Sequence, residues 1–261
     1  MTTSTTTSSQ SDEHYCPHCE RLVPKLEVDI LGIKKIVQPI CDCEAREIDL
    51  EFAEIQNRQR EKEIQELFSI SDMGEKLSES TFDNFVRRTG TEKMLDNAKS
   101  YVEYFDEWGA DSLLIWGIPG NGKSRIAAAG SNSLHNKKRH VVFQAGPELL
   151  QRIRSTFNKK EGETEADIMK ALLTCDLLVL DDVGAEKLTE WVQDIMYRII
   201  DGRYRKNKPI LYTSNIEPKQ LARQLGDRTY DRILETSLII ENKATSYRRE
   251  VAKERMKRYV D

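Results

Sequence analysis

This sequence lacks the features that place a protein in or across a membrane. No stretch of its 261 residues approaches the ~18 consecutive apolar residues that a membrane-spanning helix needs. Its start, MTTSTTTSSQSDEH, lacks the basic and then apolar layout of a signal peptide. We therefore expect a cytoplasmic protein with no membrane partner. An excess of positive charge is also missing, since the net charge is -4, so any contact with DNA has to come from local basic clusters.

Only five cysteines are present, and a cytoplasmic compartment keeps such thiols reduced, which excludes a disulfide framework. Four of them form two close pairs, Cys16 with Cys19 and Cys41 with Cys43. This spacing predicts a closed, structural Zn²⁺ site, which supplies the folding energy that so short a segment cannot obtain from burial. His14 or His18 is an alternative ligand in place of one thiolate, and free cysteines in a flexible tail are the alternative to a metal site.

Composition divides the chain into segments. Residues 1–13 are rich in serine and threonine and have no apolar pattern, which indicates a disordered tail, and residues 14–43 hold the paired cysteines of the zinc-binding module. Residues 44–68 contain no glycine or proline and place apolar side chains at helical spacing, so we expect a helical arm between two domains. Residues 69–80 indicate a linker. Residues 81–261 form the second and larger domain.

Short apolar runs alternate with helix-like stretches throughout this larger domain. The candidate strands are Ser112–Trp116, His140–Ala145, Leu177–Asp181, Ile210–Ser214 and Leu238–Glu241. Near-continuous apolar strands separated by helices predict an α/β domain in which a five-stranded parallel sheet is covered on both faces.

The first of these strands leads directly into a nucleotide-binding motif. Residues 117–124, GIPGNGKS, fit the pattern G-x-x-x-x-G-K-[ST], and a helix-forming segment follows. Glycines in such a loop let backbone N–H groups close around phosphate oxygens, and the helix N-terminus adds partial positive charge. Lys123 is predicted to neutralise the β- and γ-phosphates of ATP, and the Ser124 hydroxyl to bind Mg²⁺. The predicted nucleotide contacts are Gly117, Pro119, Gly120, Asn121, Gly122, Lys123, Ser124 and Arg125.

Two further strands end in polar side chains. The apolar run LLVL is followed by Asp181 and Asp182. Beside a phosphate-binding loop, Asp181 is predicted to hold Mg²⁺ through water, and Asp182 to orient or deprotonate the attacking water. The strand ILYTS is followed by Asn215, where a γ-phosphate sensor is expected. Taken alone, each of these three residues also suits an ordinary turn.

Together these motifs resemble the AAA+ ATPases, and among them the DnaC/DnaI/IstB-like group. The resemblance covers residues 81–261 and includes TFDNF at the start of the ATPase domain, LLVLDDVGAEK as the Walker B segment and TSN, with Asn215, as sensor 1. The segment GDRTYDRI resembles the group's arginine-finger segment, which implies that Arg228, or alternatively Arg232, reaches the nucleotide of a neighbouring subunit. SYR resembles sensor 2, which implies that Arg248 contacts ATP in its own subunit. Guanidinium groups suit both tasks because they stabilise phosphate charge with planar, bidentate hydrogen bonds.

The resemblance implies a helicase loader that hydrolyses ATP to ADP and phosphate. Loaders of the DnaI type have an N-terminal zinc module that binds a replicative hexameric DNA helicase, and their ATP-bound subunits self-associate in a ring or spiral along single-stranded DNA. The segment STFN is similar to the DNA-contacting segment of loaders, which implies that Phe157 stacks on a base and that Lys159 and Lys160 contact phosphates. Packing of Phe157 within a helix is the alternative.

Two other functions stay open on the sequence. One is a transposition helper ATPase of the IstB type, against which the N-terminal cysteines argue because such ATPases generally lack them. The other is a module that binds ATP without hydrolysing it and modulates a host loader, against which the acidic pair Asp181 and Asp182 argues.

Overall fold

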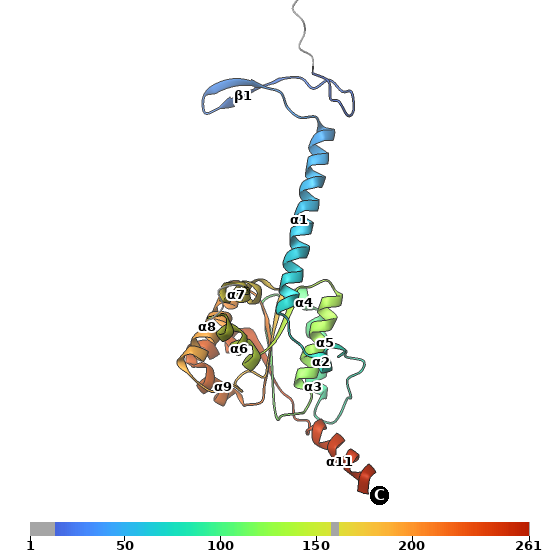
Figure 1. Cartoon of the computed structure of the whole chain (residues 1–261), viewed down its shortest axis with the longest axis vertical. Helices are drawn as coiled ribbons and strands as arrows, with labels where there is room; N and C mark the ends of the chain where they lie inside the picture. Colours follow the sequence, from blue (N-terminus) through green and yellow to red (C-terminus); the bar gives the residue numbers. More distant parts are fainter. Residues whose placement is uncertain (1–13, 158–161, 261) are drawn as a thin grey trace, which may run out of the picture. The chain divides into compact units, whose positions relative to one another are not determined.

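The computed structural model describes residues 14–157 and 162–260, with side chains at all of these positions except 57–70 and 260. The predicted tail, residues 1–13, lies outside the described residues. The chain divides into two compact units, Met1–Glu63 and Ile64–Asp261 (Figure 1). The finer division into module, arm and linker stays a prediction. No helix within the described ranges is both long enough and apolar enough to cross a membrane.

The first unit contains a β-hairpin that the sequence analysis did not predict. Strands β1 (Leu26–Ile30) and β2 (Ile33–Val37) are antiparallel and joined by Leu31 and Gly32. Both turn residues have positive φ, 57° and 82°, as a two-residue turn that matches the twist of the strands requires. The Gly32 N–H donates to Asp29 Oδ1 at 2.7 Å and fixes the turn. Asparagine or aspartate is the usual first residue of such a turn. Because leucine occupies this position, as Leu31, the sequence contains no signal for the turn.

A long helix follows the hairpin. Helix α1 runs from Asp42 to Ile70 and includes the predicted arm, residues 44–68. Acidic residues occupy its first turn, Asp42 and Glu44, where they interact favourably with the partial positive charge of a helix N-terminus.

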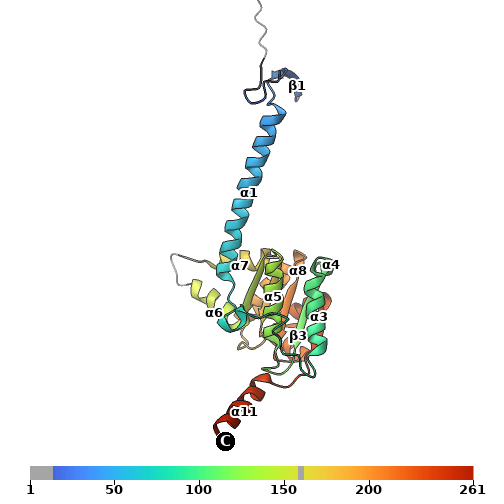
Figure 2. The same cartoon turned by 90° about the vertical axis from the view of Figure 1, so that its right-hand side faces the viewer.

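The second unit is a five-stranded parallel sheet between two layers of helices, as predicted (Figure 1, Figure 2). Its strands are β3 (Ser112–Trp116), β4 (Val141–Ala145), β5 (Leu177–Asp181), β6 (Ile210–Ser214) and β7 (Ser237–Glu241). They lie in the order β4-β5-β6-β3-β7, so β3 is interior and pairs with two strands from much later in the chain. In such sheets ligands bind at the carboxyl ends of the strands, where the strand order reverses.

The helices of this unit cover both faces of the sheet. They are α2 (Glu75–Ser78), α3 (Glu92–Glu103), α4 (Phe105–Trp108), α5 (Lys123–Asn136), α6 (Gly146–Thr156), α7 (Glu165–Thr174), α8 (Glu190–Arg205), α9 (Pro218–Leu225), α10 (Asp227–Thr236) and α11 (Tyr247–Val260). Alternate strand residues bury on opposite faces: Leu113 packs with α3 and α5, and Leu114 packs with α6 to α10. Period-two alternation of apolar side chains on both faces is what a fully covered parallel sheet requires.

The predicted linker, residues 69–80, makes ordered contacts in this unit. The Phe143 N–H donates to Ser71 Oγ at 3.0 Å, and the Asp72 N–H donates to Phe143 O at 2.9 Å. Strand β4 is at the edge of the sheet, so its outer backbone groups need such partners. Helix α2 also lies within the predicted linker.

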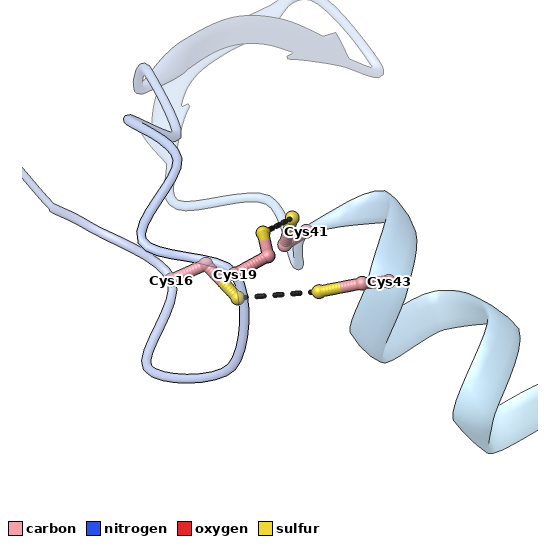
Figure 3. Close-up of side chains that lie close together, drawn as sticks. All are labelled: Cys16, Cys19, Cys41 and Cys43. Atoms are coloured by element: carbon pink, nitrogen blue, oxygen red, sulfur yellow. Dashed lines mark hydrogen bonds between the residues drawn. The ribbon is translucent and has the colours of Figure 1, made fainter.

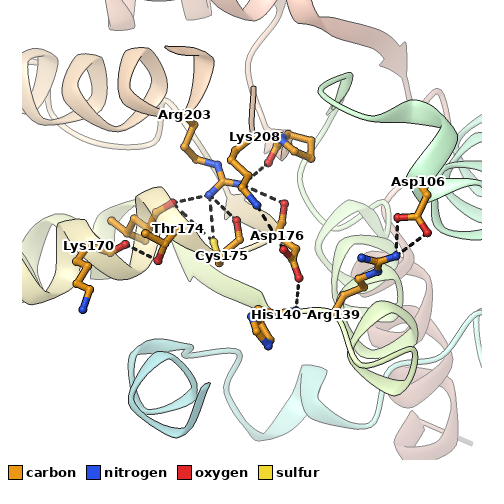
Figure 4. A network of polar contacts seen from close by, with 11 residues as sticks. Asp106, Arg139, His140, Lys170, Thr174, Cys175, Asp176, Arg203 and Lys208 are labelled. Atoms are coloured by element: carbon orange, nitrogen blue, oxygen red, sulfur yellow. Dashed lines mark hydrogen bonds and ion pairs between the residues drawn. The ribbon is translucent and has the colours of Figure 1, made fainter. Parts of the chain in front are cut away.

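One buried arginine ties together the end of the sheet opposite the nucleotide motif (Figure 4). Arg203 Nη1 donates to the carbonyls of Leu172 and Cys175, and Nη2 to those of Asp176 and Pro209. A guanidinium group satisfies several carbonyls at once because its donors form a rigid planar fork. Arg203 therefore holds the C-terminal end of α7 and the starts of β5 and β6 in register.

Candidate nucleotide and metal sites

The phosphate-binding loop joins the interior strand β3 to α5 and has a conformation that only glycine adopts freely. Gly117 and Gly120 have φ of 147° and 79°. A Cβ atom at Gly117 would lie 2.5 Å from the Asn242 carbonyl oxygen, and one at Gly120 would lie 2.5 Å from Ser246 Oγ. The Asn242 backbone, just after β7, and the Ser246 side chain, just before α11, thus approach the loop so closely that no side chain fits at these glycines.

A pocket of about 410 Å³ opens over this loop at the carboxyl ends of the strands. Among the predicted site residues, those that line it are Pro119, Gly120, Asn121, Gly122, Lys123, Ser124, Arg125, Asp181, Asp182, Asn215 and Arg248. Gly117 lies beneath the loop, where its carbonyl accepts from Lys123 Nζ at 2.8 Å. The fold therefore brings together residues that are up to 131 positions apart in the chain, from Gly117 to Arg248.

Lys123 is buried, and its ammonium group is surrounded by oxygen atoms. Besides Gly117, it donates to the Ile118 carbonyl at 3.0 Å, to Asn121 Oδ1 at 3.1 Å and to Asn215 Oδ1 at 3.0 Å. Burial lowers the pKa of Lys123 to about 8, since a buried ammonium loses its hydration. No carboxylate forms an ion pair with it among the described residues. The charge is thus held in place by neutral groups, which a phosphate can replace.

Asp181, the last residue of β5, and Asp182, which follows it, are tied by hydrogen bonds to β6 and to Asn215 after it. Thr213 Oγ1 donates to Asp181 Oδ1 at 2.5 Å and accepts from the Asp182 N–H at 2.9 Å. Asn215 Nδ2 donates to Asp182 Oδ1. Burial raises the pKa of both carboxyl groups, because a desolvated carboxylate is less stable than the neutral acid.

The oxygen atoms at this end of the pocket fit Mg²⁺. Ser124 and Asp181, the two predicted magnesium ligands, both line this pocket. Carboxylate, hydroxyl and water oxygens are the ligands that magnesium prefers, and it is usually bound by one or two carboxylates together with phosphate oxygens.

Asn242 is a site residue that the sequence analysis missed. Its Nδ2 donates to the Asn121 carbonyl at 3.1 Å, and Asn121 Nδ2 donates to the Asn242 carbonyl at 3.0 Å. Both side chains are buried, so this reciprocal amide pair joins the phosphate-binding loop to the end of β7. An asparagine directly after the last strand was the available signal, but nothing in the sequence indicates that the last strand pairs with the first.

The three predicted phosphate-contacting arginines lie in different environments. Arg248, in the first turn of α11, lines the pocket. Arg228 is exposed on α10 and lies outside the pocket. The alternative finger, Arg232, is engaged within its own unit, since it forms an ion pair with Asp201 at 2.6 Å. Its guanidinium also lies over the ring of Tyr197 at 5.1 Å.

Phe157, the predicted DNA-contacting residue, caps the C-terminal end of α6 and is 55% exposed. Its ring meets that of Trp191 edge to face, with 6.1 Å between the centroids. The Arg154 guanidinium lies 4.6 Å from the centre of the Trp191 ring. Phe157 is thus a surface residue at the rim of an aromatic cluster. Lys159 and Lys160 lie outside the described residues.

In the first unit the four paired cysteines converge (Figure 3). The sulfur atoms of Cys16 and Cys43 are 3.4 Å apart, those of Cys19 and Cys41 are 3.5 Å apart, and all four lie within 4.8 Å of one another. Tetrahedral Zn²⁺ with Zn–S bonds of about 2.3 Å requires sulfur atoms roughly 3.8 Å apart, so the cluster fits this ion.

Local hydrogen bonds favour the thiolate form of Cys16, whereas hydrogen bonds with Cys16 and Cys19 raise the pKa of Cys43. Backbone N–H groups of His18 and Cys19 lower the pKa of Cys16 to about 6. The side chains of His14 and His18 are exposed, and neither belongs to the cluster.

The second unit and its pocket define a P-loop ATP-binding protein of the AAA+ class. The family model of IstB-like ATP binding proteins matches residues 49–255, and the chain belongs to this family. The chain is 28% identical to the replicative helicase loader DnaC of Escherichia coli (strain K12) over 201 residues, which are 76% of this chain and 81% of that protein. These findings confirm the resemblance that the motifs indicated.

Two solved structures share the fold. The crystal structure of the DnaC helicase loader matches with a TM-score of 0.59 and 23% identity, covering 65% of this chain and 100% of that one. The crystal structure of DnaI matches with a TM-score of 0.56 and 25% identity, covering 66% of this chain and 95% of that one.

Proposed function

We propose that this protein is an ATP-dependent loader that places a replicative hexameric DNA helicase on single-stranded DNA. The observation that carries the proposal is the pocket in which the phosphate-binding loop, Asp181, Asp182 and Asn215 meet, in a chain of the IstB-like family. The similarity to DnaC and DnaI supports the loader role over other tasks of that family.

The nucleotide site hydrolyses ATP to ADP and phosphate. Lys123 exchanges its neutral partners for the β- and γ-phosphate oxygens. Ser124 and Asp181 would hold a magnesium ion, which would supply neutralisation of phosphate charge. Asp182 orients a water molecule and takes its proton as the oxygen attacks the γ-phosphorus. The bond to the bridging oxygen then breaks, and Asn215 and Arg248 stabilise the charge that moves onto the phosphate groups.

Self-association completes this site. Arg228 is exposed and lies outside the pocket of its own chain, as expected of a finger that reaches the nucleotide of a neighbouring subunit. Arg232 is the weaker candidate for the arginine finger, because it would have to give up its ion pair with Asp201 to reach a neighbouring nucleotide. ATP therefore promotes assembly into a ring or spiral, and hydrolysis is fastest in the assembly.

The first unit binds the helicase. One face of the hairpin has apolar side chains at five of six positions: Leu26, Val28, Ile30, Ile33 and Val37. Leu26, Ile30 and Ile33 are all more than half exposed. A contiguous exposed apolar face on a small module is typical of a protein interaction site, and the zinc cluster holds this module in shape.

Single-stranded DNA contacts the second unit at Phe157. Its exposed ring offers a base a stacking surface worth about 1–3 kcal/mol, whatever the base. Lys159 and Lys160 follow in sequence and contribute phosphate contacts that weaken with salt.

Lys123→Ala tests the nucleotide site. We expect ATP affinity to fall by about 100-fold, because losing a charge-assisted hydrogen bond costs up to ~3 kcal/mol. The measurement is equilibrium binding of a fluorescent ATP analogue with magnesium. Lys137→Ala is the matched control, since Lys137 caps the other end of α5 and donates to the Val102 carbonyl outside the pocket. Equal affinity of the Lys123→Ala variant and the wild-type protein for the ATP analogue would exclude the proposed nucleotide site.

A pull-down distinguishes the loader from its alternatives. The protein, with ATP, is offered a hexameric replicative helicase and a transposase, and phosphate release is measured with and without single-stranded DNA. Capture of the helicase and DNA-stimulated release of phosphate are expected. Capture of the transposase alone favours a transposition helper, and helicase capture without phosphate release favours a non-hydrolysing modulator.

A further inference from the structure

Arg88 joins three parts of the nucleotide site that are distant in sequence. Its Nη1 donates to the Thr245 carbonyl at 3.1 Å and to both carboxylate oxygens of Glu250, at 3.1 and 3.2 Å. Its Nη2 donates to the Asn121 carbonyl at 3.3 Å, and its guanidinium lies 5.0 Å from the centre of the Tyr247 ring. The side chain is only 15% exposed, and its hydrogen bonds to Glu250 and to the Asn121 carbonyl are partly buried.

Helix α11 depends on these contacts because little else in its own unit covers it. Its residues are exposed from Ala252 to Tyr259, and among the side chains described in this helix only Glu250 and Val251 are partly buried. The first turn is fixed by the Tyr247 N–H, which donates to the Gly120 carbonyl at 2.9 Å, and by Glu250, which accepts from Arg88 and from Thr245 Oγ1. The first turn is also where Arg248 enters the pocket.

We propose that Arg88 is a positioning residue that fixes the first turn of α11 to the phosphate-binding loop and so places Arg248 at the phosphates. The inference rests on the proposed nucleotide site and assigns a residue that acts there through another. Arg88 also lines the pocket, but its guanidinium is committed to Glu250, to Thr245 and to the loop carbonyl, so it holds the helix and does not bind phosphate itself.

Geometry, and not charge alone, makes arginine necessary at this position. The planar fork of a guanidinium reaches carbonyls on one side and a carboxylate on the other. A lysine ammonium keeps the charge but is a single point that cannot bridge Asn121 and Glu250 together. Arg88→Lys therefore separates positioning from electrostatic attraction of the nucleotide.

The first test is amide hydrogen exchange in the nucleotide-free protein. We expect Arg88→Lys to speed exchange in residues 247–251 by about tenfold while leaving strand β5 unchanged, because exchange follows the local opening free energy. Arg87→Lys is the control: the neighbouring Arg87 is exposed and pairs only loosely, at 3.6 Å, with Asp96. Unchanged exchange in residues 247–251 of the Arg88→Lys variant would overturn the proposal.

The second test is a double-mutant cycle on the preference for ATP over ADP. If Arg88 acts through Arg248, Arg88→Lys and Arg248→Ala each reduce the preference by about tenfold, and the double variant is no worse than Arg248→Ala alone. If the double variant instead loses the product of the two single losses in ATP preference, Arg88 does not act through Arg248. That result would also overturn the proposal. If the wild-type protein binds no nucleotide, the proposed function is wrong. The hydrogen-exchange experiment still decides whether Arg88 holds α11.

Discussion

The first unit has a buried core of Cys16, Val23 and Cys41, with Cys19 and Cys43 packed against it, whereas the second unit buries an apolar cluster on each face of a sheet. The second unit obtains its free energy of folding from burial, whereas the first buries almost no apolar area. A metal held by the four paired cysteines would supply what burial cannot. The small unit leaves most apolar side chains of its hairpin exposed, while the large one buries most of its own.

The contrast between the two units is wrong if the first unit folds without metal. We expect chelation of zinc to unfold residues 14–41 completely, because structural zinc contributes on the order of 10 kcal/mol or more. Hydrogen exchange should show full loss of protection there, while the calorimetric transition of the second unit stays in place. Cys175→Ala, which removes a buried cysteine of the second unit, should leave the zinc content unchanged. Protection of residues 14–41 that survives chelation would contradict the metal's role.

The contrast between the two units becomes more precise if the stability of the second unit also depends on one buried polar side chain, that of Arg203. Arg203→Met should destabilise it by about 3 kcal/mol, since the carbonyls of Leu172 and Pro209 lose their buried partner. Denaturant unfolding measures this, and Arg205→Ala is the control. The Arg205 side chain is 71% exposed, and Asp201 keeps Arg232 as a partner, so the loss of Arg205 should cost less than ~0.5 kcal/mol. Equal effects of the two changes would refute a special role for Arg203.

The smallest expected effect concerns the exposed apolar face of the hairpin. Ile33→Ser should weaken helicase binding about tenfold without changing ATP hydrolysis, because removing a docked apolar side chain costs roughly 1.5 kcal/mol. Ile36→Ser is the matched control, since Ile36 is also exposed but pairs with Glu27 on the opposite face. Helicase affinity measured by biolayer interferometry should separate the two variants. Equal losses would assign the contact to the hairpin as a whole.

The sequence predicted the fold of the second unit better than that of the first because its signals are local there. Each of the five strands is an apolar run, and Lys123, Asp181 and Asn215 follow strand ends that a parallel sheet brings together. The hairpin escaped prediction because its turn begins with Leu31.

The parts of the site that escaped prediction depend on long-range pairing. Arg88 and Glu250 are 162 positions apart, and Asn121 and Asn242 are 121 apart. Of these four residues only Asn121 belongs to a motif, and only the order of the strands brings the members of each pair into contact.

The reciprocal amide pair of Asn121 and Asn242 has a consequence for synthesis of the chain. During translation, Asn121 of the phosphate-binding loop is added to the chain 121 residues before Asn242, its hydrogen-bond partner. A nascent chain or a truncated product that ends before β7 therefore carries the whole loop sequence but lacks the strand that braces it. We therefore expect the chain to become able to bind nucleotide only once β7 and Asn242 have been synthesised.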